Sequence, residues 1–199
     1  QYNLLSALKP IEDVRESLVM AQYEGYLDEE NISKDSKTET YAALKLFIDN
    51  ERWQGVPFFI RTGKKMGDRE TQVVVQFKAI GDVPGNVLII RIQPDEGVYF
   101  QFNAKKPGTE QELQQISLDF CQSCILENRI NTPEAYERLL DACFKDDRSL
   151  FSQWNQIVTS WTFVNDLLEK YYEQGAPLYT YKQGSMGPKE ADKFVDWIK

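Results

Sequence analysis

Runs of β-branched and aromatic residues fill the first two thirds of the chain, and they constrain its fold more than any other feature. Such runs are typical of strands, and turn signals such as GDVPG at 81–85 separate them. No helix of crossover length interrupts the series, which predicts a mainly antiparallel sheet. The predicted strands cover 17–26, 38–49, 57–64, 71–80, 86–93, 98–103 and 113–126.

Helical periodicity replaces this pattern in the last third of the chain. Thr132 and Pro133 are typical of a helix start ahead of EAYERLLDACF, and a second amphipathic run covers 152–172. A short final helix is predicted over 189–198. Strands followed by helices indicate an α+β fold, with a large, mainly antiparallel β-sheet and helices packed on one face. Segment 38–49 is the ambiguous one, because its Ala, Leu, Lys and Glu residues favour helix.

The first residues indicate a helix that begins elsewhere. Leu4, Leu5 and Leu8 have the spacing of one helix face, Pro10 stops the pattern, and the chain opens with Gln1. We interpret residues 1–9 as the tail of a helix from a missing amino-terminal domain. The remaining residues, 10–199, are enough for one sizeable core and are predicted to form a single domain.

Charge and composition restrict the partners. The net charge of -8 repels polyanions, so nucleic acid and anionic membrane surfaces are not expected partners, and any bound anion must be captured locally. No apolar run reaches the roughly 18 residues of a membrane helix, and QYNLLSALKP does not resemble a signal peptide. We therefore expect a cytoplasmic protein.

The sequence offers no catalytic or metal-binding set. It contains no histidine to act as a general base near pH 7, so no catalytic residue is predicted in this chain. Cys121 and Cys124 have C-x-x-C spacing, but with Cys143 they give three cysteines where a structural zinc needs four ligands. We expect reduced thiols and no metal site. The sequon at Asn31 would matter only in a secreted protein.

A basic cluster at 61–69 is the best candidate anion site, with four positive charges against one negative. Lys64 ends an apolar strand and Arg69 follows across Gly67, so a tight turn would bring the two cations together to clamp a phosphate. The alternative, which base rates favour for an arbitrary cluster, is a set of solvated loop charges. The cluster is not a P-loop, because Lys65 stands where that motif requires Ser or Thr.

A second polar pair lies at the end of the strand 86–93. Arg91 and Gln93 flank Ile92 and would share one face of the strand, which Pro94 ends. This pair is interpreted either as part of a binding site or as an ordinary strand terminus followed by an acidic turn.

Several segments closely resemble the carboxy-terminal domain of glucose-6-phosphate dehydrogenase, in order and over nearly the whole chain. They are TETYAALKLFIDNERWQGVPFFIRTGKK, VVVQFK, IRIQPDEGV, KKPG, EAYERLLDA and YKQGSMGPKEAD. The resemblance implies a large antiparallel sheet with helices on one side, whose sheet forms the contact of a homodimer. Whether dimers pair into tetramers is left open.

The resemblance also implies a substrate site: Lys64, Arg69 and Gln93 fall on the family's positions that bind the phosphorylated sugar. The family enzyme oxidises carbon 1 of glucose 6-phosphate to the lactone and passes hydride to NADP, the first step of the oxidative pentose phosphate pathway. Its histidine base and its cofactor motif belong to the amino-terminal domain. We therefore expect a substrate-binding and dimerisation fragment that is inactive alone and binds glucose 6-phosphate weakly.

Some members of the family bind a second, structural NADP in this domain, and here the match is poor. The residues that agree with that site are Arg61, Arg91, Tyr99 and Asp119. The residues that stand where basic ones are expected are Glu70, Val74, Gln101 and Met186. No structural NADP is therefore expected. Two alternative functions are a non-catalytic dimerisation module and the related hexose-6-phosphate dehydrogenase of the endoplasmic reticulum.

Overall fold

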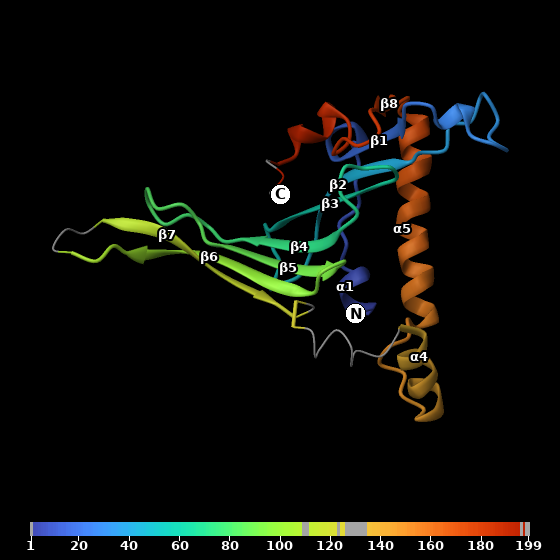
Figure 1. Cartoon of the computed structure of the whole chain (residues 1–199). Helices are drawn as coiled ribbons and strands as arrows, with labels where there is room; N and C mark the ends of the chain where they lie inside the picture. The colour runs from blue at the N-terminus through green and yellow to red at the C-terminus, as the bar shows by residue number, and fades with distance from the viewer. Residues whose placement is uncertain (1, 109–111, 123, 126–134, 196, 198–199) are drawn as a thin grey trace. The chain divides into compact units, whose positions relative to one another are not determined.

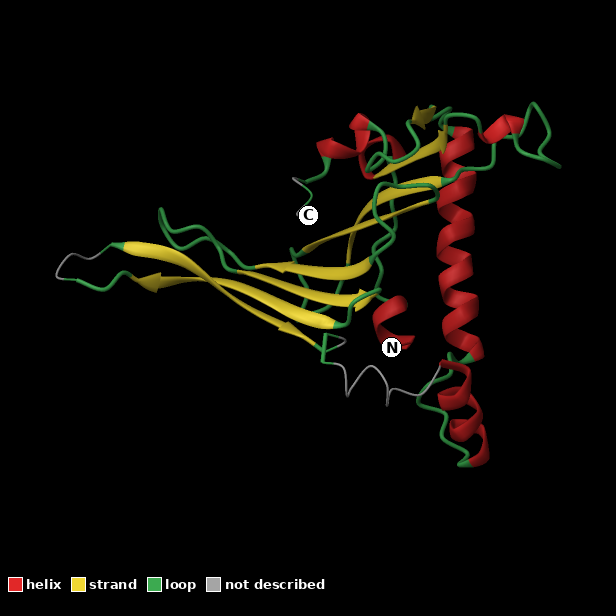
Figure 2. Cartoon of the chain, in the orientation of Figure 1, coloured by secondary structure: helices red, strands yellow, loops and turns green. Residues whose placement is uncertain are grey.

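The computed structural model describes residues 2–108, 112–122, 124–125, 135–195 and 197. The predicted α+β class is confirmed (Figures 1 and 2). The strands are divided over two four-stranded sheets rather than joined in one large sheet. Each sheet belongs to its own compact unit: the first unit combines Gln1–Asp68 with Asp147–Trp197, and the second is Arg69–Asp146.

All seven predicted strands are present, and an eighth was missed. They are β1 Leu18–Tyr23, β2 Tyr41–Phe47, β3 Pro57–Gly63, β4 Thr71–Gln76, β5 Val87–Gln93, β6 Gly97–Lys105, β7 Leu113–Cys121 and β8 Leu178–Tyr181. The α-helices are α1 Tyr2–Leu5, α2 Val14–Ser17, α4 Ala135–Phe144 and α5 Trp154–Glu173, with short 3-10 helices at Tyr26–Asp28 and Lys189–Lys193.

The first unit is built on a sheet of order β3-β2-β1-β8, in which β8 lies parallel to β1 and the other neighbours are antiparallel. Every residue of β1 is buried, because both faces of the strand are covered. On one face Met20 packs against Leu167 and Tyr171 of α5. On the other face Val19 and Ala21 pack in a cluster with Tyr41 and Tyr181. Residues 18–23 therefore form the core of this unit.

The second unit is a fully antiparallel sheet of order β4-β5-β6-β7. The register aligns apolar residues across all four strands, in the rows Val73–Ile90–Val98–Phe120 and Val75–Leu88–Phe100–Leu118. In the first row each side chain is between 38% and 52% exposed. This unit therefore presents an apolar face, which we call the apolar sheet face.

The helical predictions are mostly confirmed. Helices α4 and α5 fall where the periodicity places them, whereas Thr132 and Pro133 lie outside the described residues. The predicted final helix over 189–198 is wrong in its extent, because the described part of it is the 3-10 turn Lys189–Lys193. The assignment of residues 1–9 to a preceding domain, and of 10–199 to one domain, stays a prediction.

The cysteine pair differs from the expectation of reduced thiols. The chain turns directly after β7, so the Cα atoms of Cys121 and Cys124 lie 5.2 Å apart and the two sulfurs form a disulfide. Cys143 is free and exposed. Within the described ranges no helix is long and apolar enough to cross a membrane, and no group of His, Cys, Asp and Glu side chains is placed to hold a metal ion.

Candidate functional site

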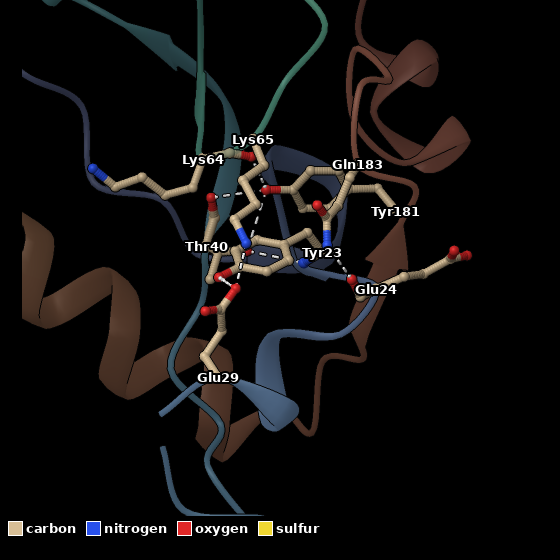
Figure 3. A network of polar contacts seen from close by, with 8 residues as sticks. All are labelled: Tyr23, Glu24, Glu29, Thr40, Lys64, Lys65, Tyr181 and Gln183. Atoms are coloured by element: carbon tan, nitrogen blue, oxygen red, sulfur yellow. Dashed lines mark hydrogen bonds and ion pairs between the residues drawn. The ribbon is translucent and has the colours of Figure 1, made fainter. Parts of the chain in front are cut away.

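The turn after β3 carries the basic cluster, and its main chain is held on both sides. The N–H of Lys64 donates to the carbonyl of Thr40 over 2.8 Å, and the hydroxyl of Tyr181 lies 2.7 Å from the carbonyl oxygen of Lys64 (Figure 3). The N–H of Gly184 donates to the carbonyl of Lys65 over 2.9 Å. The turn is therefore fixed to the residue before β2, to the last residue of β8 and to the segment that follows β8.

Glycine is required where β3 enters this turn. A Cβ atom on Gly63 would lie 2.8 Å from the ring of Tyr41 and 2.8 Å from the sulfur of Met66. Side chains cannot approach this closely, so the backbone reaches the buried Tyr41 ring only because residue 63 has no side chain.

Lys65 is already paired. Its ammonium forms an ion pair with Glu29 and lies 4.6 Å from the ring centroid of Tyr23. The hydrogen bond from Lys65 lowers the pKa of the Glu29 carboxyl below its ordinary value, and the same bond raises the pKa of Lys65. With its charge compensated and its side chain tethered, Lys65 is poorly suited to bind a ligand.

Arg61 is also engaged. Its guanidinium lies 4.6 Å from the ring centroid of Trp197, a cation–π contact, and the side chain is half-buried in β3. Two of the four cations in the cluster therefore support the fold of the first unit.

Lys64 and Arg69 are the cations that remain. Both are exposed, and neither side chain forms a hydrogen bond or ion pair with another residue in the part of the chain that the structure describes. Figure 3 shows the Lys64 side chain extending away from the network that holds Lys65. Lys64 belongs to the first unit and Arg69 to the second, so the convergence of their side chains stays a prediction.

The structure brings Arg69 and Gln93 to the same end of the second sheet. Gln93 is the last residue of β5 and pairs with Thr71, and Arg69 precedes Thr71 by two residues. The register shifts between Thr71 and Gln72, so that Gln72 pairs with Arg91. Gln93 is exposed, and its peptide bond to Pro94 is cis. Both predicted ligands therefore lie at the same end of the second sheet.

Within the second unit, the described residues that would hold a second, structural cofactor carry compensating negative charges. The guanidinium of Arg91 is bound by Asp119, although its Nε is buried without a partner among the described residues. Gln101 contacts Gln115 over 3.4 Å. Glu70, which carries a negative charge, accepts a hydrogen bond from Gln72. This donor set of the second unit does not fit a phosphorylated cofactor, because the guanidinium of Arg91 is compensated by a carboxylate and Glu70 stands where the resemblance expects a basic residue.

Sequence reasoning missed the residues that hold the turn. The sequence pattern places Thr40 in a strand and Tyr181 in a segment of the family resemblance, and it gives neither of them, nor Glu29, a role in the turn. Their partners are far away in the sequence, since Tyr181 contacts Lys64 across 117 positions and Lys65 contacts Glu29 across 36. No local signal marks such pairs.

The fold and the turn define a class of protein, an α+β domain that presents, directly after an antiparallel strand, a lysine whose ammonium has no partner among the described residues. The chain belongs to the family described as glucose-6-phosphate dehydrogenase, C-terminal domain, whose profile matches residues 1–197.

Individual relatives agree with this assignment. The chain is 43% identical over 213 residues to glucose-6-phosphate 1-dehydrogenase of Bacillus subtilis, covering 96% of the chain and 43% of the relative. It is 36% identical to glucose-6-phosphate 1-dehydrogenase 5, cytoplasmic, of Arabidopsis thaliana, covering 96% of the chain and 38% of the relative. The chain therefore spans less than half the length of these relatives.

A solved structure described as glucose-6-phosphate dehydrogenase in complex with its substrate glucose-6-phosphate is also similar. It matches with a TM-score of 0.85 and 33% sequence identity, and the match covers 100% of this chain and 44% of that one.

Proposed function

We propose that the chain is the substrate-binding and dimerisation domain of an NADP-dependent glucose-6-phosphate 1-dehydrogenase. The full-length enzyme oxidises the C1 hydroxyl of glucose 6-phosphate to 6-phosphoglucono-lactone and forms NADPH. One observation carries the proposal. Within the basic cluster, Lys64 and Arg69 are the cations without a partner among the described residues, and they are two of the three positions that the family resemblance assigns to the sugar phosphate.

The three residues have complementary tasks in this proposal. The ammonium of Lys64 supplies a point charge to the phosphate, and the planar guanidinium of Arg69 supplies paired donors. The amide of Gln93 both donates and accepts hydrogen bonds, which suits a phosphate oxygen or a sugar hydroxyl. These residues bind and orient the substrate. In this proposal the amino-terminal domain of the full-length enzyme holds NADP, the hydride acceptor, and supplies the base, as the family resemblance implies.

The substrate assignment is tested with Lys64→Ala in the full-length enzyme. Loss of a charge-assisted hydrogen bond of about 1.5–3 kcal/mol raises KM for glucose 6-phosphate by about 10-fold to 100-fold, and kcat changes little. Lys65→Ala is the matched control, since it removes the same charge from the next residue but breaks an internal ion pair. Equal KM values for Lys64→Ala and the wild type reject the assignment.

The apolar sheet face supports a homodimer. Four strands align exposed apolar side chains in the register, and the 62% exposure of Leu118 is high for a residue in the middle of a strand. A second copy would remove this surface from water, and contiguous exposed apolar surface marks interfaces. Leu118→Asp should shift the sedimentation coefficient from dimer to monomer, whereas the control Ser117→Asp, on the opposite face, should not. A dimer that survives Leu118→Asp contradicts this interface, and the same runs report any tetramer.

The isolated chain is proposed to be inactive and to bind no structural NADP. It lacks a histidine base, and its donor set does not fit the second cofactor. Incubation with glucose 6-phosphate and NADP should produce no NADPH, and titration calorimetry with NADP should give no heat above dilution. Saturable NADP binding refutes the second statement. A cytoplasmic location is proposed as well, supported by the name of the plant relative.

A further inference from the structure

The hydroxyl of Tyr181, the last residue of β8, lies against the main chain of the turn that carries Lys64. The tyrosine is 3% exposed. Its hydroxyl oxygen lies 2.7 Å from the Lys64 carbonyl, 3.1 Å from the Thr40 carbonyl and 3.2 Å from the Thr40 hydroxyl (Figure 3). A phenol has one proton to donate, and the shortest contact assigns it to the carbonyl of Lys64.

Thr40 contacts both the hydroxyl of Tyr181 and the main chain of Lys64. The N–H of Tyr23 donates to the Thr40 hydroxyl over 3.0 Å. The hydroxyl proton of Thr40 then has two oxygens in reach, that of Tyr181 at 3.2 Å and the Ala21 carbonyl at 3.5 Å, and the shorter contact assigns it to Tyr181. The carbonyl of Thr40 accepts the N–H of Lys64 over 2.8 Å. Both main-chain polar groups of Lys64 are therefore bonded, one to Thr40, the residue before β2, and the other to Tyr181 of β8.

This arrangement fixes the main chain of Lys64, while its ammonium group has no partner among the described residues. Lys64 follows the last residue of β3. The direction in which the flexible four-carbon stem leaves the turn is then set by the backbone. A binding group must be held close to its productive position by its supporting contacts, because small displacements weaken the interaction.

We propose that Tyr181 is a positioning residue for the substrate phosphate: its hydroxyl holds the carbonyl of Lys64 and so sets the direction in which the Lys64 ammonium is presented. The inference rests on the proposed function of Lys64. It adds Tyr181, a residue of β8 that lies outside the basic cluster. Tyr181 does not contact the substrate itself and acts by positioning Lys64.

The test is Tyr181→Phe in the full-length dehydrogenase. The change removes the hydroxyl and keeps the ring, which packs 5.4 Å from the ring centroid of Tyr41 and 6.4 Å from that of Tyr23. We expect KM for glucose 6-phosphate to rise about fivefold, in line with the loss of one neutral hydrogen bond. The inhibition constant of inorganic phosphate should rise by the same factor, and kcat should stay constant. A fall in kcat with no change in KM overturns the proposal.

The matched control is Tyr179→Phe. This variant makes the same chemical change two residues earlier in β8, at a hydroxyl that bonds to no described residue. Its KM and its phosphate inhibition constant should equal those of the wild type. If Tyr179→Phe raises both constants as much as Tyr181→Phe does, the effect belongs to the strand in general and the proposal fails.

A double variant separates this inference from the function on which it rests. In the Lys64→Ala background, Tyr181→Phe should have no further effect on KM, because the residue it positions is gone. Additive effects mean that Tyr181 acts elsewhere, which overturns the inference. If Lys64→Ala raises KM and Tyr181→Phe does not, the inference alone is rejected. If Lys64→Ala leaves KM unchanged, the proposed function is rejected first.

A second pair of variants serves if Tyr181→Phe yields too little folded protein. Thr40→Val removes the hydroxyl that orients the proton of Tyr181, and Thr40→Ser restores a hydroxyl at the same place. KM for glucose 6-phosphate and the phosphate inhibition constant should rise in Thr40→Val and return towards the wild-type values in Thr40→Ser. If Thr40→Ser does not restore KM and the phosphate inhibition constant, the hydrogen bond from Thr40 to Tyr181 does not position Lys64.

Discussion

Two neighbouring buried tyrosines should respond in opposite directions to the same substitution. Tyr41 is 2% exposed, and its hydroxyl is buried without a hydrogen-bond partner among the described residues. Tyr181 is 3% exposed, and its hydroxyl lies within hydrogen-bonding distance of three oxygens. The ring centroids are 5.4 Å apart, so the two side chains share one apolar environment. Their hydroxyls differ mainly in whether they are satisfied.

The expected sizes follow from the cost of an unpaired polar group. A buried hydroxyl without a partner costs about 1–3 kcal/mol, so Tyr41→Phe should raise the free energy of unfolding by about 1–2 kcal/mol. Tyr181→Phe should lower it by about 1–3 kcal/mol, because it removes a hydrogen bond and leaves the Lys64 carbonyl unpaired. At about 2–4 °C per kcal/mol for a chain of this size, the two melting temperatures should move in opposite directions by several degrees.

Urea and thermal unfolding of the chain, followed by circular dichroism, measure both values. A Tyr41→Phe variant that is less stable than the wild type refutes the reasoning, since the hydroxyl must then have a partner. The pH dependence of the protein's stability tests the burial of the Tyr41 hydroxyl independently. Burial raises the pKa of Tyr41 to about 12, from the 10.0 of an exposed tyrosine. The unfolded state can ionise Tyr41 from about pH 10 whereas the folded state keeps it protonated, so the wild type loses stability as the pH rises from 10 through about 12. Tyr41→Phe has no phenol to ionise and should therefore resist alkali better than the wild type.

Two further predictions concern the first unit. Because the pKa of Glu29 is lowered, the stability from its pair with Lys65 is present above the ordinary glutamate pKa and is lost as the pH falls through the lowered value. The difference in the free energy of unfolding between wild type and Glu29→Gln should therefore shrink in acid. A difference that does not depend on pH contradicts the pairing. Gly187→Ala should destabilise the protein by about 3 kcal/mol, because φ is +111° and a Cβ would lie 2.3 Å from the Tyr41 ring. Gly175→Ala is the control: φ is +58° but the space around it is open, so it should cost about 1 kcal/mol. Equal melting temperatures for the two variants refute this prediction.

Local composition predicted the strands because each of the seven carries its own signal of β-branched and aromatic residues between turns. Segment 38–49 contains β2 in spite of its helix-favouring residues, since pairing with β1 and β3 on both sides outweighs intrinsic propensity. The sequence LYTY of β8 is too short to stand out. It forms a strand because β1 offers a free edge, and that edge is set by tertiary structure.

The candidate site was predicted from the number of positive charges in segment 61–69, and this number does not show which of the charges are compensated by other residues. Lys64 and Lys65 are adjacent and chemically identical, yet one pairs with Glu29 and the other has no described partner. Arg61 lies over Trp197, a residue from the opposite end of the chain. The family resemblance selected Lys64 without this information. The structure adds a physical reason for the selection, while the role of the three ligands stays a proposal.

The parallel pairing of β8 with β1 also bears on how the protein is made. During synthesis β1 leaves the ribosome well before β8, and β8 then pairs along one edge of β1. Until then the main-chain groups along one side of β1 lie open to other chains, and the carbonyl of Lys64 lacks its tyrosine partner. Ribosomal truncation products that end before residue 178 should therefore associate through this edge, and the turn of Lys64 should gain its tyrosine partner only after β8 has been synthesised.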